Sequence, residues 1–360
     1  MGLNEARNHL STQREVTHTN EPKIENLRQS FVPKVQNKDI NNPLKNEEEI
    51  NIEDYTDKKI QEGLKIYFTE NKSKFIKRLS KGPPNCFRWV AWSIIRGLPE
   101  NRNDDVYKNF VNQELEKENK ERIIRDIERT FSDRNIQKNE LRKVETSLYN
   151  VLKSYWNLDK EVGYCQGMNF IVGLLLILTD NDETETFYFM VAAFTNSFIT
   201  TKKFDYSFRG LFSEEFPLLH LFNYIFDKIF EKQIPDLKKH LDQMWITYDI
   251  WIGQWFQTLF TIILPINWLQ RLWDCIFAEN IFFLIKFGIA FCNIIKKDLL
   301  SMSEEIEIID YFKNLQKFSL CASNQELDNK CDINSLILKA NKIKFSPEEY
   351  VKNFEKKNEF

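Results

Sequence analysis

The chain is poor in the residues that bind metals or form disulfides. Its 360 residues include only four histidines and six cysteines. The histidines are far apart and show no ligand spacing, so we expect no metal site. The cysteines form no CxxC pair and the first residues do not resemble a secretory signal, so we interpret them as reduced thiols of a cytoplasmic protein. These residues are His9, His18, His220, His240, Cys86, Cys165, Cys275, Cys292, Cys321 and Cys331.

A basic excess and a long hydrophobic run are missing as well. The net charge is only −3, which argues against nucleic-acid binding, because that function usually shows as a strongly basic face. The best candidate for a membrane span, Ile281 to Ile295, contains Lys286 and is shorter than the roughly 20 residues that cross a bilayer. We therefore expect a buried helix there and no membrane span. The chain also lacks a GxxxxGK(S/T) loop, so no nucleotide site of its own is expected.

Composition divides the chain into a polar start and an aromatic main part. Residues 1–54 hold one aromatic side chain, Phe31, whereas all eight tryptophans lie between Trp89 and Trp273. A segment that cannot bury apolar surface does not offset its chain entropy, so residues 1–54 are predicted to be a disordered tail. The regions predicted after it are a leading helix over 55–74, a main domain over 75–345 and a C-terminal helical extension over 346–360.

The main part shows helical periodicity. Ile123, Ile127 and Phe131 recur at i, i+4 and i+8, which is typical of one buried helix face. A continuous apolar run follows over 170–178, and Pro265 is expected to separate two later helices. Few segments are rich in β-branched residues with period two. The predicted fold class is therefore all-α, as a single multi-helix domain.

Four short blocks occur in order along this helical region. They are Gly82-Pro83-Pro84 with Arg88 and Trp92; Ile123, Asp126, Arg129 and Thr130; the stretch from Gly163 to Phe170, with Tyr164-Cys165-Gln166-Gly167-Met168; and the stretch around Trp255 with Arg271-Leu272-Trp273-Asp274. Together they resemble the TBC domain family, whose members make Rab-type GTPases hydrolyse GTP. The resemblance covers residues 75–340, with small departures at Pro83 and Leu272.

The resemblance implies a site and a partner. It implies that Arg129 and Gln166 are catalytic fingers, one stabilising phosphoryl charge and the other orienting the attacking water. The implied partner is a Rab-family GTPase in its GTP-bound state, which brings its own Mg²⁺ and GTP, so this chain needs no cofactor. The implied setting is vesicle trafficking, in the cytoplasm or peripheral to endomembranes through partners. Supporting residues would be Asp126, Thr130, Tyr164 and Gly167, and structural ones Arg88, Trp92, Trp255, Arg271 and Asp274.

The residues alone leave these roles open. At about 100° per residue, Arg129 lies opposite the isoleucine stripe, with Asp126 three residues earlier as a partner. Spacing alone favours an ordinary solvated arginine, and Arg122 and Arg125 lie close by. An amide at Gln166 could position a water or cap the next helix.

Other roles stay open for the neighbouring residues and for the whole chain. Tyr164 could contact a partner or hold its own loop, and Arg271 and Asp274 could pair with each other or with the finger helix. One alternative function is a catalytically silent TBC module that binds a Rab or acts as a scaffold. Another is an unrelated helical scaffold, in which Arg129 and Gln166 would lie far apart.

Overall fold

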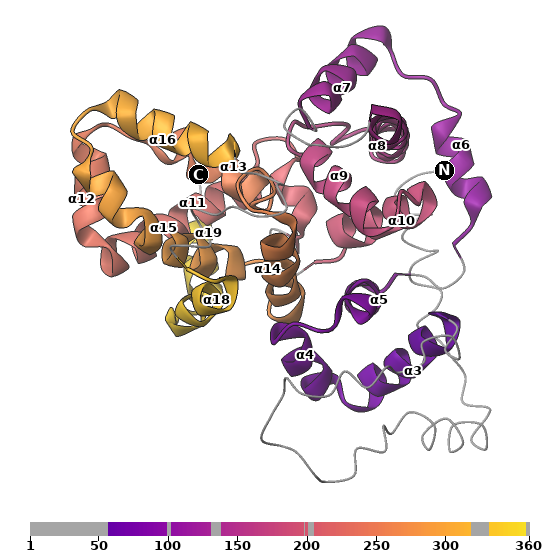
Figure 1. Ribbon diagram of the computed structural model, residues 1–360, viewed down its shortest axis with the longest axis horizontal. Coiled ribbons are helices and arrows are strands. Elements are labelled where there is room, and N and C mark those ends of the chain that lie inside the picture. The colour runs from indigo at the N-terminus through magenta and orange to yellow at the C-terminus, as the bar shows by residue number, and fades with distance from the viewer. Residues whose placement is uncertain are drawn as a thin grey trace.

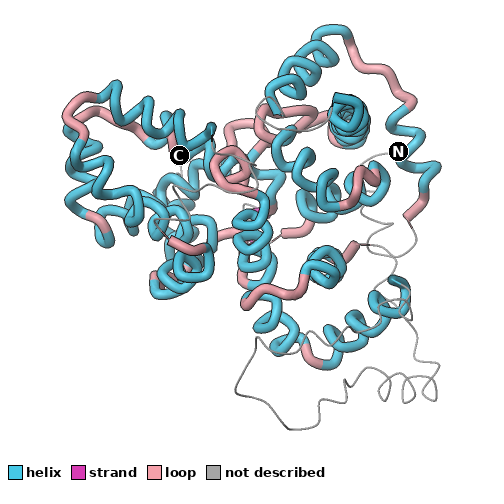
Figure 2. Tube along the Cα trace, in the orientation of Figure 1, coloured by secondary structure: helices cyan, strands magenta, loops and turns pink. Residues whose placement is uncertain are grey.

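The computed structural model describes residues 57–98, 102–130, 138–197, 199–200, 205–317 and 331–357. The tail expected over 1–54, and Phe131 of the predicted stripe, lie outside these residues. Most of the described chain is helical, as Figure 2 shows, which confirms the all-α prediction. A two-stranded antiparallel ladder, β1 (Ile199–Thr200) with β2 (Asp205–Tyr206), is a small addition that the sequence did not indicate.

The N-terminal half of the fold contains eight described helices. They are α3 (Asp57–Glu70), α4 (Lys72–Ser80), α5 (Asn85–Arg96), α6 (Asp104–Val111), α7 (Lys117–Thr130), α8 (Lys138–Leu158), α9 (Met168–Leu178) and α10 (Glu183–Thr195). The single leading helix predicted over 55–74 is wrong in its bounds. Asn71, at φ −133° and ψ 41°, ends one helix before α4 begins, and α4 continues past the expected boundary.

The C-terminal half follows a short 3₁₀ turn, η2 (Phe208–Leu211). Its described elements are α11 (Pro217–Gln233), α12 (Pro235–Gln243), η3 (Tyr248–Ile250), α13 (Ile252–Gln257), α14 (Ile266–Ala278), α15 (Phe283–Ser301), α16 (Glu305–Lys317), α18 (Ile333–Lys342) and α19 (Pro347–Lys357). In Figure 1, α7 to α10 form one lobe, and α14 lies between this lobe and another, above α3 to α5. The other lobe consists of α11, α12, α13, α15, α16, α18 and α19.

Aromatic side chains fill the core where the tryptophan distribution predicted it. Trp251 stacks on Phe312 with ring centroids 4.7 Å apart, and Trp255 is completely buried beside them. The expected buried helix over 281–295 is also observed as most of α15. Trp245 is the exception, because its side chain is 83% exposed after α12. Within the described ranges, no helix combines the length and apolar character needed to span a bilayer.

Candidate functional site

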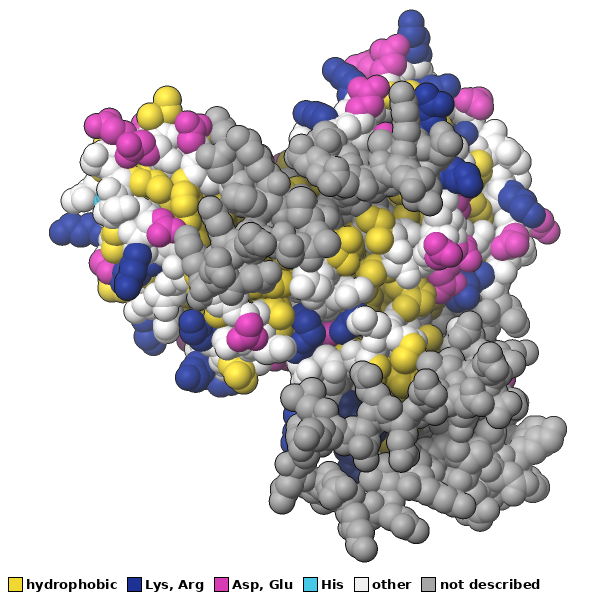
Figure 3. Space-filling view, in the orientation of Figure 1, with side chains coloured by type: hydrophobic (Ala, Val, Ile, Leu, Met, Phe, Trp, Pro, Cys, Tyr) yellow, Lys and Arg dark blue, Asp and Glu magenta, His cyan; other side chains and the backbone are white. Residues whose placement is uncertain are grey.

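Helix α7 has one apolar face and one charged face. Ile123 and Ile127 are buried against α8 and α9, while the Arg129 side chain is 64% exposed. The predicted outward direction of Arg129 is therefore observed. In Figure 3, basic and acidic side chains lie side by side over the tip of the lobe where Figure 1 places α7. The helix ends at Thr130, which puts Arg129 in its last turn.

Asp126 is the buried partner of this arginine. The Arg129 Nη2 donates to its Oδ1, as the i,i+3 spacing predicted. The hydroxyl of Tyr164 donates to its Oδ2 at 2.7 Å. Burial raises the pKa of Tyr164, and the hydrogen bond to Asp126 acts in the same direction, so the phenol keeps its proton. Tyr164 thus holds its own loop against α7 instead of facing a partner.

Asn169, the second residue of α9, also contacts α7. Its Nδ2 donates to the Thr130 hydroxyl at 2.8 Å and to the Asp126 carbonyl at 3.3 Å. Its Oδ1 accepts from the Gly167 backbone N–H at 3.0 Å and lies 3.2 Å from the Tyr164 hydroxyl. Sequence reasoning quoted this residue but gave it no role. The available signal was a single polar residue inside an otherwise apolar helix.

Gln166 is exposed on the loop between α8 and α9. Gly167 follows it at φ 107° and Gly163 precedes it at φ 61°, both backbone conformations that favour glycine. Gly167 is the N-cap residue of α9, and this position carries no side-chain capping bond. Within the residues that the structure describes, the Gln166 amide has no hydrogen-bond partner, so the capping alternative is not observed.

Arg129 and Gln166 line one cleft of about 450 Å³. One wall of this cleft consists of Arg122, Asp126, Arg129, Cys165, Gln166, Gly167, Asn169 and Phe170. A second hollow of about 530 Å³ shares several of these residues and is lined by Arg122, Arg125, Asp126, Glu128, Arg129 and Gln166. The two arginines near Arg129 in sequence therefore lie at the same site. The guanidinium of Arg122 lies 5.8 Å from the centroid of the Tyr164 ring.

The opposite wall of the cleft comes from the second lobe. It consists of Phe216, Gln254, Gln257, Thr258 and Ile262. The Gln257 amide donates to the Leu211 carbonyl at 3.3 Å and lies 3.7 Å from the Cys165 sulfur, which links this wall to the Gln166 loop. Phe216 has a positive φ of 47° ahead of Pro217 at the start of α11. Nothing in its sequence surroundings marked it as a site residue.

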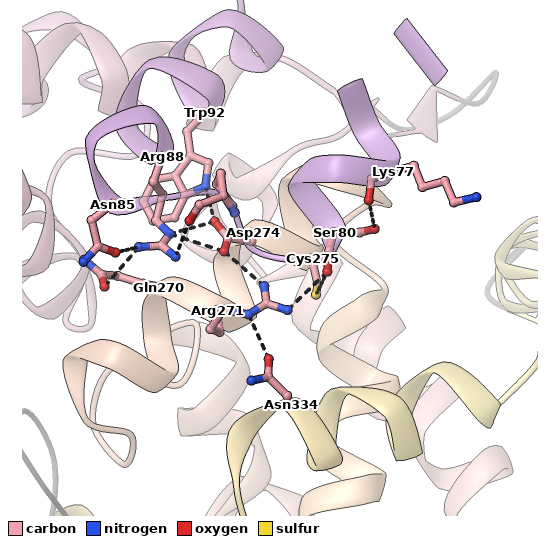
Figure 4. Close-up of polar contacts among 11 residues, drawn as sticks. Lys77, Ser80, Asn85, Arg88, Trp92, Gln270, Arg271, Asp274, Cys275 and Asn334 are labelled. Atoms are coloured by element: carbon pink, nitrogen blue, oxygen red, sulfur yellow. Dashed lines mark hydrogen bonds and ion pairs between the residues drawn. The ribbon is translucent and has the colours of Figure 1, made fainter. Parts of the chain in front are cut away.

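Four of the remaining predicted residues, Arg88, Trp92, Arg271 and Asp274, form a separate cluster, shown in Figure 4. Asp274 of α14 is completely buried and accepts from Arg88 Nε at 3.0 Å, Trp92 Nε1 at 2.9 Å and Arg271 Nη1 at 3.0 Å. Burial raises the pKa of Asp274, and the two guanidiniums oppose that effect. Arg271 thus pairs with Asp274 and not with α7.

This cluster joins helices from both ends of the domain. Arg271 also donates to the Ser80 carbonyl of α4 and to the Asn334 side chain of α18, each at 3.2 Å. The interpretation of Arg88, Trp92 and Arg271 as structural residues therefore fits their contacts. Trp255 of α13, which is completely buried, also fits that interpretation. Among the described residues, no group of three or more His, Cys, Asp or Glu side chains could hold a metal ion.

The fold and this cleft define a class of protein, an all-α domain that presents an arginine and a glutamine together from two segments joined by buried hydrogen bonds. Within that class, the chain belongs to the Rab-GTPase-TBC domain family, whose model matches residues 85–300. The resemblance inferred from the four sequence blocks is confirmed.

Two relatives illustrate the match. Rab GTPase-activating protein eat-17 of Caenorhabditis elegans is 32% identical over 245 residues, which cover 68% of this chain and 26% of that protein. Growth hormone-regulated TBC protein 1 of Xenopus tropicalis is 29% identical over 252 residues, which cover 69% of this chain and 70% of that protein. The matched region thus spans about a quarter of the worm protein and most of the frog protein.

Two solved structures share the fold. The Chlamydomonas flagellar RabGAP TBC domain aligns with a TM-score of 0.59 at 21% identity, over 79% of this chain and 91% of that chain. The Ypt/Rab-GAP domain of Gyp1p aligns with a TM-score of 0.60 at 16% identity, over 79% of this chain and 98% of that chain. At these identities the likeness shows the fold alone.

Proposed function

We propose that this protein is a GTPase-activating protein for a Rab-family GTPase and acts on the GTP-bound form. The observation that carries the proposal is that Arg129 and Gln166, both exposed, line the same cleft in a domain of this family. The names of its relatives, among them a Rab GTPase-activating protein, support the same partner class. The nucleotide and Mg²⁺ belong to the partner. The setting that follows is cytoplasmic membrane trafficking, with recruitment to membranes through partners.

Arg129 is the group that stabilises the negative charge of the transition state. Negative charge spreads over the phosphoryl oxygens during transfer, and an arginine inserted in trans stabilises it. Such a residue is worth about 10³ to 10⁵ in rate, or about 4–7 kcal/mol of barrier. The bond from Arg129 to the buried Asp126 carboxylate restrains the guanidinium before the partner arrives. Restraint of this kind lowers the entropy that must be lost on reaching the phosphates.

Gln166 is the group that holds the attacking water. A carboxamide donates and accepts at once, so it can bind a water molecule through both functions. Its exposed position between two glycines leaves room for a second protein surface to approach the loop. In this scheme Gln166 acts in place of a glutamine of the GTPase.

The test is single-turnover GTP hydrolysis by a panel of Rab GTPases, each preloaded with GTP and mixed with the full chain. We expect stimulation of at least one Rab, and loss of most of it in Arg129→Ala and in Gln166→Ala. Lys117→Ala is the matched control, because Lys117 lies on the same helix, is 90% exposed and lines neither hollow. It should stimulate like the unmodified chain.

Two results would contradict the proposal. Unchanged hydrolysis across the whole panel rules out the catalytic role. Tight binding of a GTP-loaded Rab with unchanged hydrolysis, measured by titration calorimetry beside the kinetic assay, establishes the catalytically silent binding module instead.

A further inference from the structure

Asn169 bonds to both of the segments that carry the proposed fingers. We infer that Asn169 is the positioning residue that sets the placement of Arg129 relative to Gln166. The inference rests on the proposed function, because placement matters only if both side chains act on one nucleotide. Asn169 itself is 1% exposed and does not have to touch the partner.

The orientation of this carboxamide is fixed by what surrounds it. The Gly167 N–H can only donate, so the atom that faces it must be Oδ1. The Asp126 carbonyl can only accept, so the atom that faces it must be Nδ2. A second partner lies at each end, the Tyr164 hydroxyl at Oδ1 and the Thr130 hydroxyl at Nδ2. The side chain thus has one satisfied orientation, and little water reaches it.

Each contact lies within one turn of a finger. Gly167 is the residue after Gln166, so its N–H belongs to the peptide group that Gln166 shares. Asp126 and Thr130 flank Arg129 in the last turn of α7, and Asp126 also receives its guanidinium. A shift of α7 along α9 would therefore break the Nδ2 bonds, and a shift of the loop would break the Oδ1 bond. Asn169 resists both displacements at once.

The variant Asn169→Asp keeps the hydrogen-bond acceptor of this side chain and removes its donor. The carboxylate still accepts from Gly167 N–H, but it cannot donate to the Asp126 carbonyl or to the Thr130 hydroxyl. We expect the maximal stimulated rate to fall about 10- to 100-fold, the range set by small misplacement of reacting groups. The KM for the GTP-loaded GTPase should stay close to the unmodified value, since the exposed contact surface is unchanged. Thr130→Val removes one acceptor and should lower the rate less, in the same direction.

Asn157→Asp is the matched control for a purely structural effect. Asn157 is also buried, and its Nδ2 donates to the Phe110 and Gln113 carbonyls at 3.0 and 3.1 Å, away from the cleft. The substitution removes two donors in the same way. We expect it to lower thermal stability while the rate for each folded molecule stays unchanged. Circular dichroism melting gives the folded fraction for every variant.

A double-mutant cycle completes the experiment. If Asn169 acts by placing Arg129, Asn169→Asp should lower the stimulated rate by a much smaller factor in an Arg129→Ala background, because the effects of coupled groups are not additive. Hydrogen exchange of the Gly167 amide in Asn169→Ala should be faster than in the unmodified chain, without any GTPase present. Full stimulation by folded Asn169→Asp and folded Thr130→Val, beside a stimulating unmodified chain, overturns the inference alone. Absence of stimulation by the unmodified chain overturns the proposed function as well.

Discussion

The Tyr164 hydroxyl donates a 2.7 Å hydrogen bond to the same Asp126 carboxylate that receives Arg129. Tyrosine and arginine therefore share one buried anion across two segments of the chain. The tyrosine is buried, whereas the arginine side chain is exposed. This places the Gln166 loop on α7 through a side chain that is 2% exposed.

Removing that hydroxyl should destabilise the protein. Tyr164→Phe leaves one oxygen of Asp126 without this donor, so we expect the free energy of unfolding to fall by about 1–3 kcal/mol. The measurement is urea denaturation followed by tryptophan fluorescence. Tyr149→Phe is the control, since the buried Tyr149 hydroxyl has no partner within the described residues and its loss should be neutral or stabilising. Equal losses in the two variants would contradict the assignment.

The Asp274 cluster should matter for stability and not for the proposed chemistry. Asp274→Ala leaves Arg88 and Arg271 without their buried carboxylate, and breaking such a pair costs about 3–5 kcal/mol. We expect that loss in urea denaturation, with an unchanged rate of stimulated hydrolysis for each folded molecule. Asp242→Asn, which disrupts an exposed pair with Lys238, should change stability far less. A specific loss of rate in folded Asp274→Ala would show that the cluster acts on the cleft.

Gly82 and Gly97 provide a matched pair of backbone substitutions. Both have a positive φ, 91° and 68°, which costs an alanine about 1–2 kcal/mol. At Gly82 the added Cβ would also lie 2.8 Å from Arg271 Nε, whose guanidinium is held by several partners, whereas at Gly97 the nearest atom is 3.9 Å away. Gly82→Ala should therefore lower the thermal midpoint more than Gly97→Ala. Equal shifts would mean that Arg271 moves aside without cost.

Alkylation of Cys165 should depend steeply on pH. Burial raises the pKa of this thiol; Arg122 opposes the effect and Asp126 adds to it. Only the thiolate reacts, so labelling by iodoacetamide should be slow at pH 7 and still rising above pH 9, the ordinary value for the group. Peptide mass spectrometry follows the site. Cys292, fully buried, should stay unlabelled until the protein unfolds. Rapid labelling of Cys165 at neutral pH would contradict the raised pKa.

Periodicity was enough to place Arg129. The stripe of Ile123 and Ile127 fixes which face of α7 is buried, and 3.6 residues per turn then determines where Arg129 points. The all-α class followed from the same kind of pattern. The resemblance, and not the pattern, distinguished Arg129 from Arg122 and Arg125, since all three line the same hollow of about 530 Å³.

Features that depend on tertiary contacts could not be predicted in this way. The role of Asn169 needs α7 and α9 to be in contact, and its four partners are spread over residues 126 to 167. The helix break at Asn71 and the positive φ of Phe216 are local backbone conformations that depend on the surrounding packing. Composition located the core but did not predict the burial of each tryptophan, because Trp245 lies within the aromatic region and is still on the surface.

The two walls of the cleft come from different parts of the chain. Arg129 and Gln166 belong to one wall, in which hydrogen bonds hold α7 to the Gln166 loop and to α9. Gln254 and Thr258 belong to the other wall. Under the proposed function, a change at the exposed Gln254 alters which GTPase surface fits, whereas the buried Thr258 lies next to Gly167 and helps to support the Gln166 loop. The proposed function therefore makes Gln254, and not Thr258, the position at which to redesign the choice of partner while Arg129 and Gln166 are kept.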